Sequence, residues 1–164
     1  MVSVFLHGCW LLAAGCSVGA ASAETVLERV SGGGALVIAH RESSVPFSYL
    51  DAAGKPVGYA VDLCLHLAEV VRRKTGMKNM PVQFLQVTPA NRVDMVAQGK
   101  ADMECGSTTN NAARQKDVAF AVTTYVEEVR MAVKASSGIA AIKDLNGKTV
   151  ATTTGTTSVQ TLRK

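Results

Sequence analysis

The feature that most constrains the fold is an alternation of short apolar segments with helical ones. Residues 35–39 form a continuous apolar run, which indicates a strand buried on both faces. A long helix is expected at residues 58–75 and a second strand at residues 82–87. A short helix at residues 91–98 and a third strand at residues 100–105 continue the pattern. This order predicts an α/β fold with a parallel sheet.

The long helix is expected to pack through one apolar face. Its basic run, residues 72–74, falls in the last turn, where cations complement the helix dipole. The formal net charge of +4 therefore does not indicate a nucleic-acid partner. The side chains that we expect to face inward are Val61, Leu65, Ala68 and Val71, with Leu67 beside them.

Three arginines follow the expected strand ends. Arg41 comes just after the first strand, Arg92 opens the short helix after the second, and Arg114 lies in a helix after the third. A parallel sheet brings the carboxyl ends of its strands to one edge, so we expect the three guanidinium groups to converge. The alternative is that each is a scaffold arginine with a salt-bridge partner of its own.

Residues 102–115 combine a strand end with small hydroxyl side chains. The segment breaks at Gly106, continues with Ser107 and Thr109, and restarts as a helix that carries Arg114. Hydroxyl and backbone groups can hold an ammonium and a carboxylate, and a guanidinium offers a carboxylate paired donors. The stretch predicts a binding site for a small zwitterion. The alternative is a junction whose hydroxyls merely cap the helix.

The sequence after Asp117 predicts the beginning of a second lobe. Residues 118–134 are rich in β-branched side chains and predict one long strand or two strands, a natural hinge between lobes. A brief helix at residues 139–145 and a strand at residues 148–153 lead to a glycine turn at residues 154–158, whose backbone N–H groups favour an anion. Since fewer than roughly 40 residues rarely fold alone, we expect the sequence to be a fragment of a longer protein.

The first 23 residues contain no Asp, Glu, Lys or Arg. A short apolar run followed by Ala21-Ser22-Ala23 predicts a signal peptide cleaved before Glu24, and the run is short for a membrane span. The alternative is lipid attachment at Cys16.

The remaining chain keeps two cysteines, Cys64 and Cys105. We expect two separate buried thiols, with a disulfide as the alternative because exported proteins can form one.

Several spaced sequence blocks occur in one order across the chain. They are residues 40–49, Gly58-Tyr59 with Asp62, Asn91-Arg92 with Gly99 and Asp102, residues 104–111 with 114–116, and residues 155–158. Together they resemble the periplasmic solute-binding proteins of ABC importers for polar amino acids, in particular the glutamate/aspartate-binding group. The resemblance implies a periplasmic-binding-protein-like fold of type II, in which two α/β lobes joined by hinge strands close on one amino acid. The second lobe would be incomplete.

The resemblance also implies roles for individual residues. Arg114 is expected to hold the α-carboxylate of the ligand, while Ser107 and Thr109 help to hold its ammonium and carboxylate. Arg41 and Arg92 are expected to face the side-chain carboxylate.

The resemblance also assigns a role to the turn around Thr157 and shows one departure, at Pro89. The turn around Thr157 is expected to close over the ligand from the second lobe. Pro89 stands where a serine is usual, so a hydroxyl contact would be lost there.

The sequence therefore predicts a monomeric periplasmic binding protein that passes L-glutamate or L-aspartate to an inner-membrane ABC permease. We expect no catalytic residue, cofactor or metal. The expected organisation is a signal peptide, a first lobe at residues 24–124, a hinge at 125–134 and the start of a second lobe at 135–164. The alternatives are a dehydratase-like enzyme of the same fold and the sensing domain of a membrane receptor. Catalysis would need an acid or base, for which Glu42 and Glu104 are the nearby candidates, although we expect Glu42 to pair with an arginine.

Overall fold

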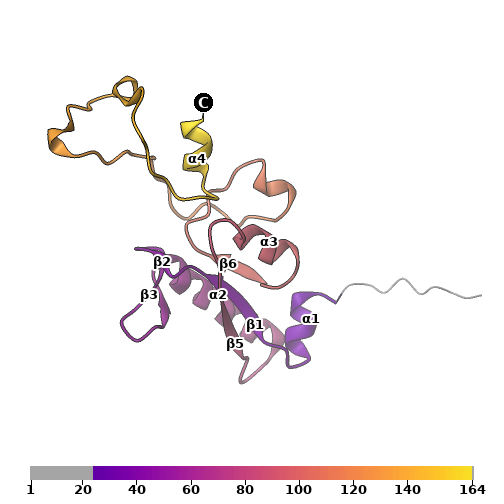
Figure 1. Ribbon diagram of the computed structural model, residues 1–164. Helices are drawn as coiled ribbons and strands as arrows, with labels where there is room; N and C mark the ends of the chain where they lie inside the picture. The colour runs from indigo at the N-terminus through magenta and orange to yellow at the C-terminus, as the bar shows by residue number, and fades with distance from the viewer. Residues whose placement is uncertain (1–23, 164) are drawn as a thin grey trace, which may run out of the picture.

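The computed structural model describes residues 24–163, so the predicted signal peptide and the alternative lipid site at Cys16 lie outside the described residues. A three-stranded parallel sheet forms the centre of the fold (Figure 1). Its middle strand is β1 (Leu36–His40), flanked by β5 (Val82–Gln86) and β6 (Met103–Cys105). The apolar run of β1 is buried along almost its whole length. The α/β prediction is confirmed.

Helices cover both faces of this sheet because successive side chains of a strand point to opposite faces. Leu36 belongs to a core cluster with side chains of α1 (Val26–Ser31) and α2 (Tyr59–Thr75). Ala39, on the other face of β1, belongs to a second cluster that includes side chains of α3 (Arg92–Ala97). The carboxyl ends of the strands are thus held between two helical layers.

The inward face of α2 differs from the prediction at one turn. Val61, Cys64 and Ala68 are buried, whereas Leu65 and Leu67, which were expected to face the core, are exposed. At 3.6 residues per turn, positions three and seven residues after Val61 stay on its face. The cysteine occupies the inner position, and the leucines turn toward solvent.

A small antiparallel sheet fills the connection between β1 and α2. It consists of β2 (Ser43–Ser44), β3 (Ser48–Leu50) and β4 (Pro56–Val57). The first residue of β3 is fully buried, and its hydroxyl oxygen accepts a hydrogen bond from the backbone N–H of Arg41 at 2.9 Å. The small sheet therefore fixes the backbone immediately after β1.

A disulfide joins Cys64 of α2 to Cys105 at the end of β6. The expectation of two separate thiols was wrong. Cys64 lies on the inner face of α2, and the register of the parallel sheet turns Cys105 toward that helix. The bond closes a loop between residues 41 positions apart, which corresponds to about 4 kcal/mol of lost chain entropy in the unfolded state.

The second half of the described chain is less regular than expected. Residues 118–134 and 148–153 form no strand, because strands need partners for their backbone N–H and C=O groups and the described residues supply none there. Val122 and Val126 are each 86% exposed. The elements that do form are short: η1 (Arg114–Lys116), η2 (Ala135–Ser137), η3 (Ile142–Leu145) and α4 (Thr157–Leu162).

The chain beyond residue 125 loops away from the sheet and returns, so that α4 lies on the side of the molecule where the parallel strands end (Figure 1). Among the helices of residues 24–163, none has the length and apolar character needed to cross a membrane.

Replacing Cys64 and Cys105 together with alanine should lower the free energy of unfolding by about 4 kcal/mol, because the unfolded chain regains the entropy of the closed loop. Urea denaturation of the full-length protein measures this change. The unaltered protein reduced with dithiothreitol should unfold at the same urea concentration as the variant. A non-reducing peptide map in which these two cysteines are not linked would contradict the assignment.

Candidate functional site

The carboxyl ends of the three parallel strands open onto a cleft of about 730 Å³. On the sheet side it is lined by residues that follow β1 and β6 and by the first residue of α3. On the other side it is lined by residues 120–127, 129, 153 and 156–158. Segments that are far apart in sequence therefore face each other across one space.

Five of the six predicted ligand-binding residues line this cleft. The hydroxyl oxygen of Ser107 lies 3.5 Å from that of Ser44, so the loop after β6 also touches the small sheet. The five are Arg41, Arg92, Ser107, Thr109 and Thr157.

Arg114 is the sixth, and it is not among the residues that line the cleft. Its Nη1 donates to the carbonyl oxygen of Thr109 at 2.9 Å, and its Nη2 donates to that of Gly155 at 3.4 Å. The side chain of Asn111 accepts a hydrogen bond from the Arg114 backbone N–H at 3.0 Å. Arg114 thus ties the loop after β6 to the glycine turn of the second half.

That glycine turn packs closely on the loop after β5. Gly155 has a φ of +78°, and a Cβ atom built there would lie 2.7 Å from the Cα of Ala90. Both the left-handed backbone and the close approach require glycine at this position. Pro89, which replaces the expected serine, lines the cleft beside this contact.

Two arginines at the cleft are buried with unpartnered donors. The side chain of Arg92 is 3% exposed, and Arg41 is 9% exposed. Nε of Arg41 and both Nε and Nη1 of Arg92 have no hydrogen-bond partner in the part of the chain that the structure describes. Burial lowers the pKa of Arg92, as do the charges of Arg114 and Arg41, whereas Glu104 opposes the shift. Buried donors without partners are costly, so they mark a place where an anion would be stabilised.

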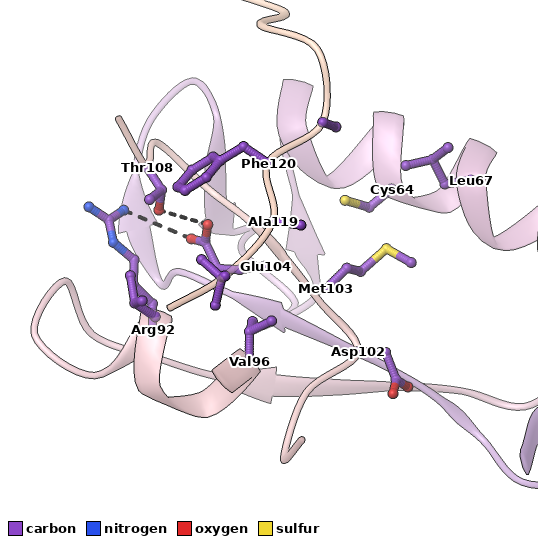
Figure 2. Close-up of a pocket in the computed structure, with 13 residues that line it drawn as sticks. Cys64, Leu67, Arg92, Val96, Asp102, Met103, Glu104, Thr108, Ala119 and Phe120 are labelled. Atoms are coloured by element: carbon purple, nitrogen blue, oxygen red, sulfur yellow. Dashed lines mark hydrogen bonds and ion pairs between the residues drawn. The ribbon is translucent and has the colours of Figure 1, made fainter. Parts of the chain in front are cut away.

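Glu104 faces this group of arginines from the middle of β6. Figure 2 shows its carboxylate between Arg92 and Thr108. Thr108 Oγ1 donates to Glu104 Oε2 at 2.7 Å, and Arg92 Nη1 lies 3.8 Å from Oε1, which is beyond hydrogen-bond range. Burial is the main reason that the pKa of Glu104 is raised, while Thr108 and the arginines pull it down. Glu104 also lines a smaller cavity of about 280 Å³, whose other walls are mostly apolar.

Sequence reasoning had considered Glu104 only as a candidate acid for an enzyme. The sequence signal that could have identified Arg92 as the neighbour of Glu104 is the alternation of side chains along the strand. Alternation along β6 places Glu104 on the face opposite Cys105, which is the face that α3 and Arg92 cover.

Glu42 does not pair with an arginine, contrary to expectation. Its Oε2 accepts a hydrogen bond from Gln86 Nε2 at 2.6 Å, and the side chain is exposed. Glu42 lies in the bend between β1 and β2, beside Gln86 at the end of β5. Within residues 24–163 no cluster of three or more His, Cys, Asp or Glu side chains is placed to hold a metal ion.

Three aromatic rings at the cleft were not predicted as a group. The ring centroids of Phe47 and Tyr125 lie 4.9 Å apart, and Tyr59 lies 6.3 Å from each of them, all in edge-on arrangements. The Tyr59 hydroxyl donates to the carbonyl oxygen of Thr124 at 3.0 Å. Because these residues come from three separate segments, no local sequence pattern could have joined them.

Comparison with known proteins places these features in context. A family model of bacterial extracellular solute-binding proteins, family 3, matches residues 36–163. A glutamate/aspartate import solute-binding protein of Salmonella typhimurium is 42% identical over 146 residues, which cover 89% of this chain and 48% of that protein. An L-glutamate/L-aspartate-binding protein of Pseudomonas aeruginosa is 41% identical over 138 residues, covering 84% and 46%.

The solved structure of an L-cysteine solute receptor of Neisseria gonorrhoeae is similar in fold, with 29% identity and a TM-score of 0.51. The match covers 58% of this chain and 37% of that one. These relatives are named as solute-binding proteins or receptors, not as enzymes. The chain spans about half the length of the curated relatives that it matches.

Glu104→Gln should become more stable relative to the unaltered protein as pH rises. The pKa of Glu104 in the folded chain is raised above its ordinary value of 4.5. Between the ordinary and the raised pKa, the folded chain binds a proton that the unfolded chain has released, so the free energy of unfolding falls as pH rises. Glutamine removes this loss, by about 1.4 kcal/mol for each pH unit over which the folded chain holds the additional proton.

Urea denaturation of both proteins at a series of pH values measures this difference. Other carboxyl groups with shifted pKa values, those of Glu28, Glu69 and Asp144, occur in both proteins and cancel. A difference that stays constant, or one that shrinks as pH rises, would contradict the buried state of Glu104.

Proposed function

Because this chain belongs to the bacterial extracellular solute-binding proteins, family 3, we propose that it binds one acidic amino acid, L-glutamate or L-aspartate, for import into the cell. The names of the Salmonella and Pseudomonas relatives support this choice of ligand. The proposal includes export to the periplasm through the signal peptide at residues 1–23. A single copy of the protein would then deliver the ligand to an ABC permease in the inner membrane.

The observation that supports an acidic ligand is the set of buried guanidinium donors that have no partner among the described residues. Among the described residues, three guanidinium nitrogens of Arg41 and Arg92 have no hydrogen-bond partner, and Arg114 adds a third positive charge nearby. Glu104 opposes this charge with one carboxylate, whose ionised form is disfavoured by burial. An amino acid with two carboxylates and one ammonium carries a net negative charge, which offsets part of the remaining positive charge.

The proposed roles follow the position of each group. Arg41 and Arg92 would bind the side-chain carboxylate, since their free donors lie at the buried end of the cleft. Arg114, with Ser107 and Thr109, would hold the α-carboxylate and the ammonium. Arg114 already organises the backbone of Thr109, so its role includes shaping the loop that touches the ligand.

The second half of the chain would close the site. Thr157 and its neighbours line the cleft from the side opposite the sheet, and Gly155 contacts the loop after β5. We propose that residues 24–124 form the first lobe, that residues 125–134 form the hinge, and that the second lobe begins at residue 135. Closure would expel water from the arginines, and the ligand carboxylates would replace that hydration.

Arg114→Ala should abolish the binding of all amino acids, whereas Arg92→Ala should mainly remove the preference for acidic ones. An uncharged ligand leaves buried guanidinium donors unpaired, at a cost of roughly 3–5 kcal/mol. The unaltered protein should therefore prefer L-glutamate to L-glutamine by roughly two to three and a half orders of magnitude. Titration calorimetry of the full-length protein with L-glutamate, L-aspartate and L-glutamine measures these affinities.

Arg73→Ala is the matched control, because Arg73 is an exposed arginine in the last turn of α2, at the end of the helix away from the cleft. It should bind as the unaltered protein does. Equal losses from Arg92→Ala and Arg114→Ala for every ligand would refute the division of roles. Failure of the unaltered protein to bind either acidic amino acid would refute the proposed function.

A further inference from the structure

Glu104 has one carboxylate oxygen in use and one free. Oε2 accepts the hydrogen bond from Thr108, whereas Oε1 is buried and has no hydrogen-bond partner among residues 24–163. The side chain is only 12% exposed, and it lines both the ligand cleft and the smaller apolar cavity. An ionised carboxylate oxygen that is buried away from water and accepts no hydrogen bond is energetically unfavourable.

The charges that face Glu104 come from three elements, and all are positive. Arg92 reaches it from α3, Arg41 follows β1, and Arg114 lies in η1. Asp102, earlier in the same segment, is occupied elsewhere, because Arg29 Nη2 donates to both of its carboxylate oxygens at 2.6 Å. Figure 2 shows Asp102 pointing away from the pair formed by Arg92 and Glu104.

The groups on the opposite face of the sheet do not reach this carboxylate. His40 pairs in register with Cys105, which belongs to the face that α2 covers. The disulfide does not titrate. Glu104 is therefore the acid that lies beside the arginines of the cleft, whereas Glu127, which also lines the cleft, comes from the opposite wall.

We propose that Glu104 takes up a proton from solvent when an acidic amino acid binds, and that its Oε1 then donates a hydrogen bond to the ligand carboxylate held by Arg92. This inference rests on the proposed function and adds a specificity-determining residue to it. The proton comes from water or buffer and is bound at Oε1, while Oε2 keeps its hydrogen bond from Thr108.

The direction of proton movement follows from the change in charge around Glu104. In the free protein burial raises the pKa of Glu104, while Thr108, Arg92, Arg41 and Arg114 lower it. A bound carboxylate takes up the free donors of the arginines, adds negative charge beside Glu104 and excludes water. Each of these effects favours the neutral carboxylic acid. Binding should therefore take up a proton, and affinity should increase as pH falls.

Calorimetry in buffers of different ionisation enthalpy counts this proton. At each pH, the observed heat of L-glutamate binding is plotted against the ionisation enthalpy of the buffer, and the slope gives the protons taken up. We expect uptake of at most one proton per ligand at pH values above about 5.5, where the ligand side chain stays ionised. The affinity should rise by up to about tenfold per pH unit where one full proton is bound.

Three variants sharpen the test. Glu104→Gln should bind with no proton uptake and with a flat pH dependence. Glu42→Gln is the matched control, because Glu42 is exposed and lies outside the cleft lining, and it should take up protons as the unaltered protein does. Thr108→Ala removes a hydrogen bond that lowers the pKa of Glu104, so maximal uptake should move to higher pH. This variant keeps the test informative if Glu104→Gln fails to fold.

The outcomes separate the two proposals. Binding of L-glutamate without proton uptake, or with uptake that survives Glu104→Gln, overturns the role of Glu104 and leaves the proposed function intact. Absence of binding for both L-glutamate and L-aspartate overturns both. Uptake that is lost only in Glu104→Gln and shifted in Thr108→Ala supports the proton-binding role.

Discussion

The parallel pairing of β6 with β1 is the interaction on which the rest of the site depends. The register aligns Cys105 with His40 and Glu104 with Ala39, so neighbouring residues of one short strand are sent to opposite faces. On one face Cys105 bonds to α2, which anchors the strand end. On the other face Glu104 meets α3. The loop that follows β6 then leaves the sheet from a fixed point beside the arginine after β1.

The second constraint is the burial of positive charge. Arg41 and Arg92 are both removed from water, yet three of their guanidinium nitrogens have no acceptor within residues 24–163. Glu104 lies too far from Arg92 for a hydrogen bond, so it compensates the charge only partly. An anionic ligand would supply the acceptors that these donors lack, which is the physical basis of the proposed preference for acidic amino acids.

Much of this architecture could be predicted because it depends on local patterns. The apolar run of β1, the helical spacing of α2 and the order of elements predicted the parallel sheet. Strand-end geometry predicted that Arg41, Arg92 and Arg114 would converge, and the first two of them line the cleft. The failure to predict the second half of the chain has one physical cause. The segment at residues 118–134 has β-branched composition but no partner strand among the described residues, and a strand exists only when its backbone groups are paired.

The sequence by itself determined which residues alternate, where the strands end, and how many arginines and hydroxyls follow those ends. Only the tertiary structure decided which groups meet. It joined Cys64 to Cys105, turned Leu65 to solvent, paired Glu42 with Gln86 and placed Glu104 beside Arg92. Local propensity acts over a few residues, whereas these contacts depend on strand register and on the rotation of packed helices. Those are properties of the assembled layers, and they decide which charges are buried together.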